Sequence, residues 1–388
     1  MKQMPRSNRV PVLALAAAAA AALTGGAAQA ADVVLATPFT LWVTETPAGG
    51  TAQFASQLKG GVRSYVFDGL GYAPGNVSLG ATIAAGSLND PSSVIATSSG
   101  SLLIADRGFN TGPGAVSRVT FTGGVPNPAT VVLAGVATGP HQIALTGSGG
   151  LVVSSLGSGA QLYPAVSPPA TVSFASGTER GAVTNGSLLY STAGSGALQT
   201  FDLGTGALLG NFNVAGASLL HYGAMFGGSL WLADAGSNFT GAGGGIYRVT
   251  LDINGNPVSS ARVANVNGAI SVAFSPFGDE MFVADHFGGT LTGYALTGTT
   301  VAAASNLFID GGTLASWGGA HVQYGGLAVT AAVPEPAAWA SMLGGLAALL
   351  AWRVRPRSAV RQTVHSTAFT MSSTTFLASP NTIMVLSM

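Results

Sequence analysis

The stretch "ISVAFSPFGDEMFVADHFGGTLTGYAL", Ile270 to Leu296, shows the pattern that decides the fold. An apolar segment leads into a Ser-Pro-Phe-Gly turn, a second apolar segment ends in Ala-Asp, and a glycine turn precedes a third, alternating segment. Short apolar or alternating runs separated by turn residues are typical of antiparallel β-strands. The stretch therefore predicts three consecutive strands of one sheet.

Four other stretches repeat this pattern, beginning at Ser92, His141, Gly181 and His221. The residues that close the five second strands are Asp106, Ser155, Thr192, Asp234 and Asp285. Their spacings are 49, 37, 42 and 51 residues. A unit of three or four short strands that recurs at about this interval indicates a β-propeller, and an ordinary β-sandwich with chance similarity is the alternative.

The blade count follows from the two ends of this region. "FTLWVTET", residues 39–46, resembles a second strand with Glu45 at the Asp position, but no first strand precedes it. "HVQYGGLAVT", from His321, resembles a first strand without partners. Pairing the two completes one blade and closes the ring without open edges. We therefore predict an all-β propeller over residues 31–332 with six blades, although residues 56–90 leave room for a seventh.

The units resemble the NHL and YVTN-type propeller repeats, in which the turn is usually Ser-Pro-Asp-Gly and the second strand ends in Val-Ala-Asp. Here Ser275-Pro276-Phe277-Gly278 has Phe in place of Asp, and only this unit keeps Ser-Pro. The resemblance therefore implies the fold and not a subfamily.

The composition limits the classes of partner. The chain has 388 residues, no cysteine, 56 glycines and 7% charged residues. Between Asp32 and Ala332 there are 13 acidic and 7 basic residues. A mildly acidic domain without a basic stripe argues against nucleic-acid binding. The absence of cysteine excludes disulfides, so the domain must be stable without them.

Residues 1–30 have the pattern of a signal peptide. Basic residues precede an apolar core over residues 10–23, and Ala28-Gln29-Ala30 forms a small-residue cleavage pattern. We expect cleavage before Ala31 and export of the protein. An ordinary N-terminal helix is the alternative.

The segment 333–357 begins with Pro334-Glu335-Pro336, continues with 16 apolar residues over 337–352, and carries arginines at its end. Those arginines are Arg353, Arg355 and Arg357. As a helix the apolar run is about 24 Å long, so this short transmembrane helix needs a slightly thinned bilayer. The arginines would hold its C-terminal side in the cytoplasm.

The three parts together resemble the PEP-CTERM sorting signal of Gram-negative bacteria. The resemblance implies an exosortase-type membrane protease as partner and transient anchoring in the inner membrane. It also implies release to the cell envelope or an extracellular polysaccharide (biofilm) matrix. Residues 358–388 extend beyond the usual end of such a signal. We expect this Ser/Thr-rich tail to be disordered or spurious, and to add nothing to the fold.

In a propeller the first strand of each blade lines the central channel, so the residues that open these strands are candidates for a ligand ring. Counted back from the second-strand ends, these residues are Ser92, His141, Arg180, His221, Ser271 and His321. His286 lies in a turn and is outside this set.

Two interpretations of the ring remain open. His141, His221 and His321 could bind a divalent metal, or each imidazole could bond to neighbouring backbone groups. Arg180 argues against a tight cation site and suits a carboxylate or sulfate. We predict no resident cofactor, and we predict that the strand-closing aspartates anchor turns through their carboxylates.

These patterns predict an exported, non-catalytic propeller that acts as a binding or scaffold protein in the outer envelope or polysaccharide matrix. A metal-dependent propeller hydrolase of the lactonase type is the alternative. The predicted ring contains no acid, which argues against that activity.

Overall fold

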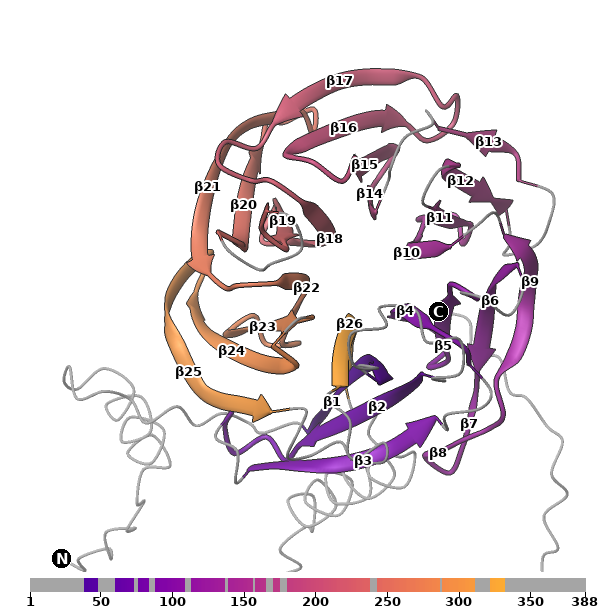
Figure 1. The fold of residues 1–388 in the computed structure, drawn as a ribbon, viewed down its shortest axis with the longest axis vertical. Coiled ribbons are helices and arrows are strands. Elements are labelled where there is room, and N and C mark those ends of the chain that lie inside the picture. Colours follow the sequence, from indigo (N-terminus) through magenta and orange to yellow (C-terminus); the bar gives the residue numbers. More distant parts are fainter. Residues whose placement is uncertain are drawn as a thin grey trace, which may run out of the picture. The chain divides into compact units, whose positions relative to one another are not determined.

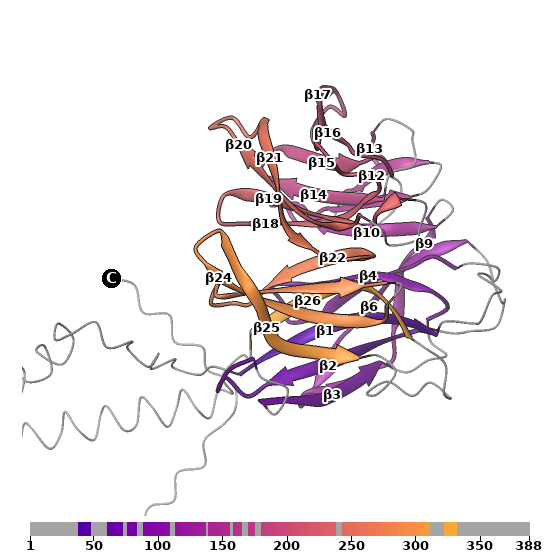
Figure 2. The same ribbon diagram turned by 60° about the vertical axis from the view of Figure 1, so that its left-hand side comes forward.

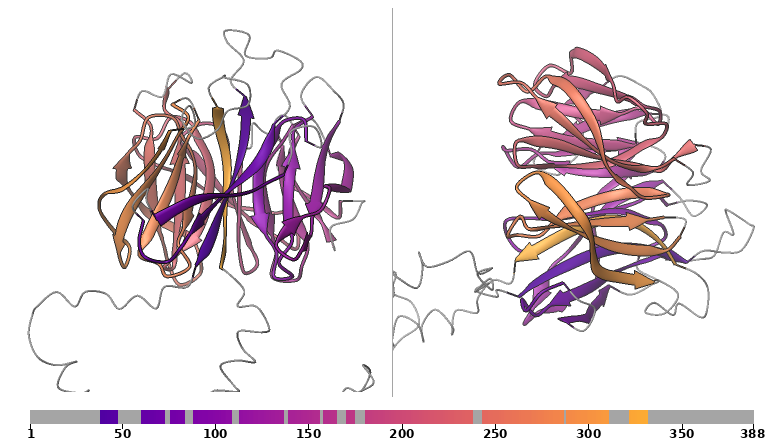
Figure 3. Two further views of the ribbon diagram at one scale, coloured as in Figure 1. Left: turned by 90° about the horizontal axis from the view of Figure 1, so that it is seen from below. Right: turned by 90° about the vertical axis from the view of Figure 1, so that its left-hand side faces the viewer.

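Six four-stranded antiparallel sheets surround a common axis like blades in a computed structural model of the chain (Figure 1). The structure describes residues 38–47, 60–72, 76–83, 88–108, 113–136, 139–155, 158–164, 170–174, 180–237, 243–286, 288–310 and 322–331. In Figures 2 and 3 the blades are seen from the side, with neighbouring sheets packed face to face.

Each blade is described from its inner strand outward. The blade that closes the ring contains β26 (Val322–Ala331), β1 (Phe39–Pro47), β2 (Gly61–Phe67) and β3 (Val77–Ile83). The next contains β4 (Pro91–Ala96), β5 (Leu102–Asp106), β6 (Gly114–Val119) and β9 (Thr130–Val136). A small hairpin of β7 (Phe121–Thr122) and β8 (Val125–Pro126) lies between β6 and β9 in the chain.

The third blade contains β10 (Pro140–Leu145), β11 (Leu151–Ser155), β12 (Gly159–Tyr163) and β13 (Val172–Ser173). The fourth contains β14 (Gly181–Asn185), β15 (Leu188–Thr192), β16 (Ala197–Asp202) and β17 (Leu208–Asn213). The fifth contains β18 (Leu220–Phe226), β19 (Ser229–Asp234), β20 (Gly245–Leu251) and β21 (Pro257–Asn265). The sixth contains β22 (Ala269–Phe274), β23 (Glu280–Asp285), β24 (Thr290–Thr297) and β25 (Thr300–Asp310).

This architecture confirms the predicted all-β propeller and its six blades. The described strands between residues 56 and 90 do not form a seventh blade, because β2 and β3 are the outer strands of the closing blade. The predicted signal peptide, the sorting segment 333–357 and the tail 358–388 lie outside the described residues. No helix within the described part of the chain is long and apolar enough to cross a membrane.

The core is divided among the blade interfaces instead of lying in one central mass. Six clusters of buried apolar residues occur, one between each pair of neighbouring blades. Successive residues of a second strand serve opposite interfaces: Leu230 and Leu232 of β19 join one cluster, whereas Trp231 and Ala233 join the next. Side chains alternate between the faces of a strand, so a strand that is covered on both faces must be apolar throughout. This explains the uninterrupted apolar second segments of the repeat.

The ring is closed by antiparallel pairing of β1 with β26, from Phe39 opposite Ala331 to Pro47 opposite Val322. The Trp42 indole donates to the Thr330 hydroxyl at 3.1 Å across this pair. Gly326 lies so close to the neighbouring blade that a Cβ there would be 2.6 Å from the Ser93 Cα. The predicted composite blade is therefore confirmed.

Candidate functional site: one end of the channel

The inner strands carry a recurring irregularity where they begin. Five of the six inner strands have a register shift near their start: it follows the first residue pair in β4, β10, β18 and β22 and the third pair in β26, whereas β14 has none. The residues in these bulges are Ser92, His141–Gln142, His221–Tyr222, Ile270 and Gly325–Gly326. Bulges redirect side chains, and here they place polar groups toward one end of the channel.

The register shows which predicted ring residues are equivalent. Ser92, His141 and His221 each directly follow the first paired residue of their strand. Ser271 is one position further along, because Ile270 occupies the equivalent place, and Arg180 precedes the first paired residue of β14. His321 lies outside the described residues, three positions before Tyr324, which pairs with Glu45.

The two serines of the predicted ring tie blades together. The Ser92 hydroxyl lies 2.7 Å from the Pro140 carbonyl oxygen and 2.9 Å from that of His141. The Ser271 hydroxyl accepts a hydrogen bond from the Leu327 N–H at 3.2 Å. Both side chains are buried, and both bonds link neighbouring inner strands.

His141, Arg180 and His221 do come together, and Tyr222 lies between the two histidines. The Arg180 Nη1 lies 3.5 Å from His221 Nε2, and the Tyr222 hydroxyl lies 3.5 Å from His141 Nδ1. The Tyr222 ring packs edge-on against both imidazoles, with centroid distances of 6.4 Å to His141 and 6.0 Å to His221. Both imidazoles are buried, at 2% and 3% exposure.

Three further charged or titratable residues, which the repeat pattern did not predict, join this cluster. Arg107 forms a 2.7 Å ion pair with Asp90, which directly precedes β4. His286 Nδ1 lies 2.8 Å from the Tyr324 carbonyl oxygen of the closing blade. Arg107 and His286 both directly follow a strand-closing aspartate, so the repeat contains a second position that points to the channel. Asp90 also supplies a carboxylate, and the predicted ring contained none.

Burial and neighbouring cations keep the three histidines neutral. Burial, followed by the positive charges of Arg107 and Arg180, holds the pKa of His141 well below its ordinary value of 6.5. Burial and then Arg180 lower the pKa of His221 in the same direction, and burial lowers the pKa of His286 to about 4. Burial raises the pKa of Tyr222 to about 12, so its hydroxyl keeps its proton.

A hydrogen bond assigns the proton of the His221 imidazole. Arginine only donates, so His221 Nε2 is an acceptor and its proton lies on Nδ1. The Tyr222 hydroxyl can donate to His141 Nδ1 or accept from it, so this contact is compatible with either His141 tautomer. Among the described residues, the His221 Nδ1–H and the His141 Nε2 atom are buried without a hydrogen-bond partner. A buried unpaired donor costs about 1–3 kcal/mol, so the His221 N–H is a position where an acceptor from a ligand would be stabilising.

The cluster carries two guanidinium groups and one carboxylate, and therefore a net positive charge in a mildly acidic domain. For simplicity we call Asp90, Arg107, His141, Arg180, His221, Tyr222 and His286 the cationic cluster. Its chemistry is that of an anion site with several N–H donors. Within the described residues no three His, Asp or Glu side chains are grouped so that they could hold a metal ion.

The strand-closing aspartates have the structural role that the sequence predicts. The Asp106 carboxylate accepts bonds from the N–H groups of Asn89, Asp90 and Gly108, at 2.8, 2.8 and 3.2 Å. Asp285 accepts from the Gly288 N–H at 2.9 Å. The prediction that these residues anchor turns is confirmed.

Comparison with known proteins supports the fold and goes no further. No protein-family description matches the sequence, and no curated protein is significantly similar to it. A chain of a nidogen–laminin complex is 12% identical with a TM-score of 0.51, over 75% of this chain and 98% of that one. A periplasmic gluconolactonase of Pseudomonas aeruginosa is 19% identical with a TM-score of 0.48, over 74% of this chain and 85% of that one. The chain is thus a six-bladed β-propeller that resembles the NHL and YVTN-type propellers.

Proposed function

We propose that this protein is an exported, non-catalytic binding propeller whose ligand is an acidic polysaccharide. A carboxylate or sulfate of the ligand would occupy the cationic cluster at the end of the channel. The observation that carries the proposal is the buried His221 Nδ1–H beside Arg180, which has no hydrogen-bond partner among the described residues. This N–H and the guanidinium offer donors and a positive charge to one anionic group.

The state of the titratable groups favours binding over catalysis. Asp90 is the acid of the cluster, and the Arg107 guanidinium holds it at 2.7 Å. A general base or acid works best with a pKa near the operating pH, whereas the pKa values of the three histidines lie well below it.

Isothermal titration calorimetry with a uronic-acid oligosaccharide tests this proposal. We expect binding to the acidic oligosaccharide and at least about tenfold weaker binding to a neutral oligosaccharide of equal length, because only the former offers charge-assisted acceptors. Arg180→Gln should weaken the acidic interaction by a similar factor. Arg118→Gln is the matched control, because Arg118 is an exposed arginine of β6. Equal affinity for both oligosaccharides, or equal effects of the two variants, would contradict the proposal.

A metal-dependent hydrolase of the lactonase type is the second candidate. The observation in its favour is that the Asp90 carboxylate lies near enough to the neutral His286 to influence its pKa, and both side chains are potential metal ligands. Lactone hydrolysis that is lost on chelation, and lost in both His141→Ala and His221→Ala, would establish this alternative.

The proposed route to the envelope rests on residues 333–357. Cleavage by an exosortase-type protease predicts a mature protein that lacks everything after about Pro336, which mass spectrometry of the released protein would show. An intact C-terminus on the mature protein would refute this route. Deletion of residues 358–388 should leave folding and export unchanged.

A further inference from the structure

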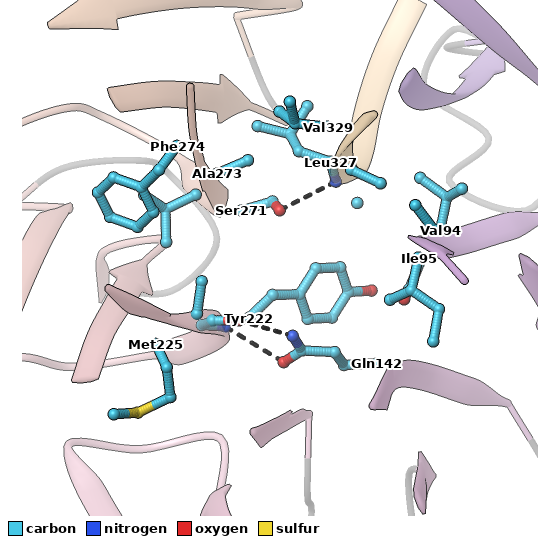
Figure 4. A pocket seen from close by; sticks show the side chains of 17 residues that line it. Val94, Ile95, Gln142, Tyr222, Met225, Ser271, Ala273, Phe274, Leu327 and Val329 are labelled. Atoms are coloured by element: carbon cyan, nitrogen blue, oxygen red, sulfur yellow. Dashed lines mark hydrogen bonds between the residues drawn. The ribbon is translucent and has the colours of Figure 1, made fainter. Parts of the chain in front are cut away.

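The other half of the channel contains a cavity of about 340 Å³ (Figure 4). Its wall is built by the inner strands β4, β18, β22 and β26, and β10 contributes Gln142. None of the residues of the cationic cluster except Tyr222 lines it. The volume lies at the lower end of the range for small-molecule pockets.

None of the described residues that line this cavity is charged. Apolar residues of all four strands line it, and those labelled in Figure 4 are Val94, Ile95, Met225, Ala273, Phe274, Leu327 and Val329. Each inner strand is also the edge strand of its sheet. The N–H and C=O groups on its unpaired side therefore face the channel. An ion in this cavity would lose its hydration without meeting an opposite charge, whereas a neutral molecule would not.

Gln142 and Tyr222 form a partition between this cavity and the cationic cluster. The Gln142 amide donates to the Gly223 carbonyl oxygen at 2.8 Å, and its oxygen accepts from the N–H groups of Ala182 and Gly223 at 2.9 and 3.2 Å. One side chain of β10 thereby fixes the inner strands of the next two blades. The Tyr222 ring forms part of the cavity floor (Figure 4), while its hydroxyl lies against His141 on the other side.

From this division of the channel we infer a second binding site, in the cavity, for a compact and neutral, largely apolar molecule with one or two hydrogen-bonding groups. The apolar side chains would enclose the body of the ligand, and the strand edges would bond its polar groups. This site is independent of the anion site, because the Gln142–Tyr222 partition separates the two. It goes beyond the proposed function and does not depend on it.

The test uses the full chain and indole as the neutral probe, with binding followed by calorimetry. Indole should bind, and tryptamine, which adds an ammonium group to the same ring, should bind at least about tenfold more weakly because the wall offers no carboxylate. Absence of indole binding, or equal binding of both probes, would overturn the inference.

Variants then separate the two sites. Ala273→Leu narrows the cavity, and Met225→Trp is the second filling variant because Met225 is half-buried and flexible. Both should abolish indole binding while leaving the interaction of the acidic oligosaccharide unchanged. Arg180→Gln should weaken the interaction with the acidic oligosaccharide and leave indole binding unchanged.

Val131→Trp, at an outer position that is 56% exposed, is the control for the added bulk and should change neither interaction. Loss of indole binding in Arg180→Gln would show one continuous site and overturn the inference. Retained indole binding in both filling variants would place the probe elsewhere, which also overturns it. If the acidic oligosaccharide fails to bind but indole behaves as described, the proposed function fails and this second site stands.

Discussion

Glu45 is fully buried in β1 and is held by Arg63 and Tyr65. Both carboxylate oxygens lie 3.0 Å from the Arg63 Nε, and the Tyr65 hydroxyl donates to the carboxylate at 3.3 Å. The Tyr324 hydroxyl extends this chain by lying 3.1 Å from that of Tyr65. The network joins β1, β2 and β26 of the closing blade.

Arg63→Met should therefore be strongly destabilising. It leaves a buried carboxylate without its counter-charge, which costs about 3 kcal/mol or more of the free energy of unfolding. Urea unfolding would measure the loss. The double variant Arg63→Met/Glu45→Gln should recover much of it, because the remaining group is neutral. Arg118→Met, at an exposed arginine, should change the free energy of unfolding by less than about 0.5 kcal/mol. Equal effects of the two arginine variants would contradict this account.

The buried histidines make stability depend on pH. His286 has a folded pKa of about 4 against an ordinary value of 6.5, so between these values the unfolded chain binds more protons than the folded one. The contribution of neutral His286 to the free energy of unfolding is thus fully present above about pH 6.5. It is lost as the pH falls toward 4, and the total loss is about 3 kcal/mol. His141 and His221 act in the same direction.

Urea unfolding at a series of pH values between 7 and 4.5 measures this dependence. We expect the free energy of unfolding to fall with pH, and to fall less steeply in His286→Asn, which does not titrate in this range. A stability that is flat between pH 7 and 5 would show that these histidines are not held neutral in the folded state.

At the scale of the element, the aspartate that closes a second strand positions the first strand of its own blade. Asp234 accepts from the N–H groups of Ser218 and Leu219, which lead into β18, at 3.2 and 2.7 Å. It also accepts from Gly236 at 3.2 Å, and this glycine has a φ of 83°, where a side chain would be strained. One carboxylate thereby fixes the start of an inner strand and the turn after β19.

Asp234→Ala should cost about 3 kcal/mol of the free energy of unfolding, because the N–H groups of the buried Leu219 and Gly236, and that of the exposed Ser218, lose a charged acceptor. Asp252→Ala is the matched control. Asp252 also accepts three hydrogen bonds, from the N–H groups of Asn254 and Asn256 and from the Asn256 amide, but it lies in an exposed hairpin where water replaces the lost acceptor. Chemical denaturation of both variants measures the difference, and equal losses would show that the burial of Asp234 is unimportant.

The repeat made the elements predictable, whereas the bulges made single positions in the channel hard to predict. Asp106, Ser155, Thr192, Asp234 and Asp285 all end second strands as expected, because apolar length and turn residues determine a strand end. Locating the first-strand residues by counting back from these strand ends assumes that each residue has one partner in the neighbouring strand. The register shifts break that assumption, so Ser271 is one position away from the residue equivalent to His141.

The rest of the cationic cluster could not be found from a single repeat position. Arg107 and His286 occupy the turn after a second strand, and only the closed ring brings that turn beside the start of an inner strand. Asp90 reaches the cluster because Asp106 fixes its backbone. These contacts join residues of different blades, so they depend on the geometry of the whole ring.

At the scale of the whole molecule, the ring is held by six separate interfaces and by one non-covalent closure. Five clusters of the core contain residues of two blades only, and the sixth adds Tyr222 of the fifth blade to the interface of the sixth and closing blades, so no central mass would hold an opened ring together. The pairing of β1 with β26 joins residues that are 290 positions apart, as in the contact between Thr40 and Thr330. Loss of this pairing would expose both edges of the closing blade.

A disulfide across the closure should therefore stabilise the molecule more than one within a blade. Thr40 and Thr330 are Cα partners in β1 and β26, and the chain has no other cysteine, so Thr40→Cys/Thr330→Cys can form only one intramolecular bridge. Closing a loop of this length contributes about 5 kcal/mol in the chain-entropy account. The pair Ser229→Cys/Thr250→Cys, also Cα partners, closes a much shorter loop within the fifth blade, worth about 3 kcal/mol.

Urea unfolding of both variants, oxidised and reduced, measures each contribution directly. Oxidation should raise the free energy of unfolding more in the closure variant than in the variant within the blade. The reduced closure variant should be slightly less stable than the unmodified protein, because the Trp42–Thr330 hydrogen bond is lost. If the bridge within the blade stabilised the protein as much as the bridge across the closure, the length of the loop that each bridge closes in the unfolded chain would not determine its contribution.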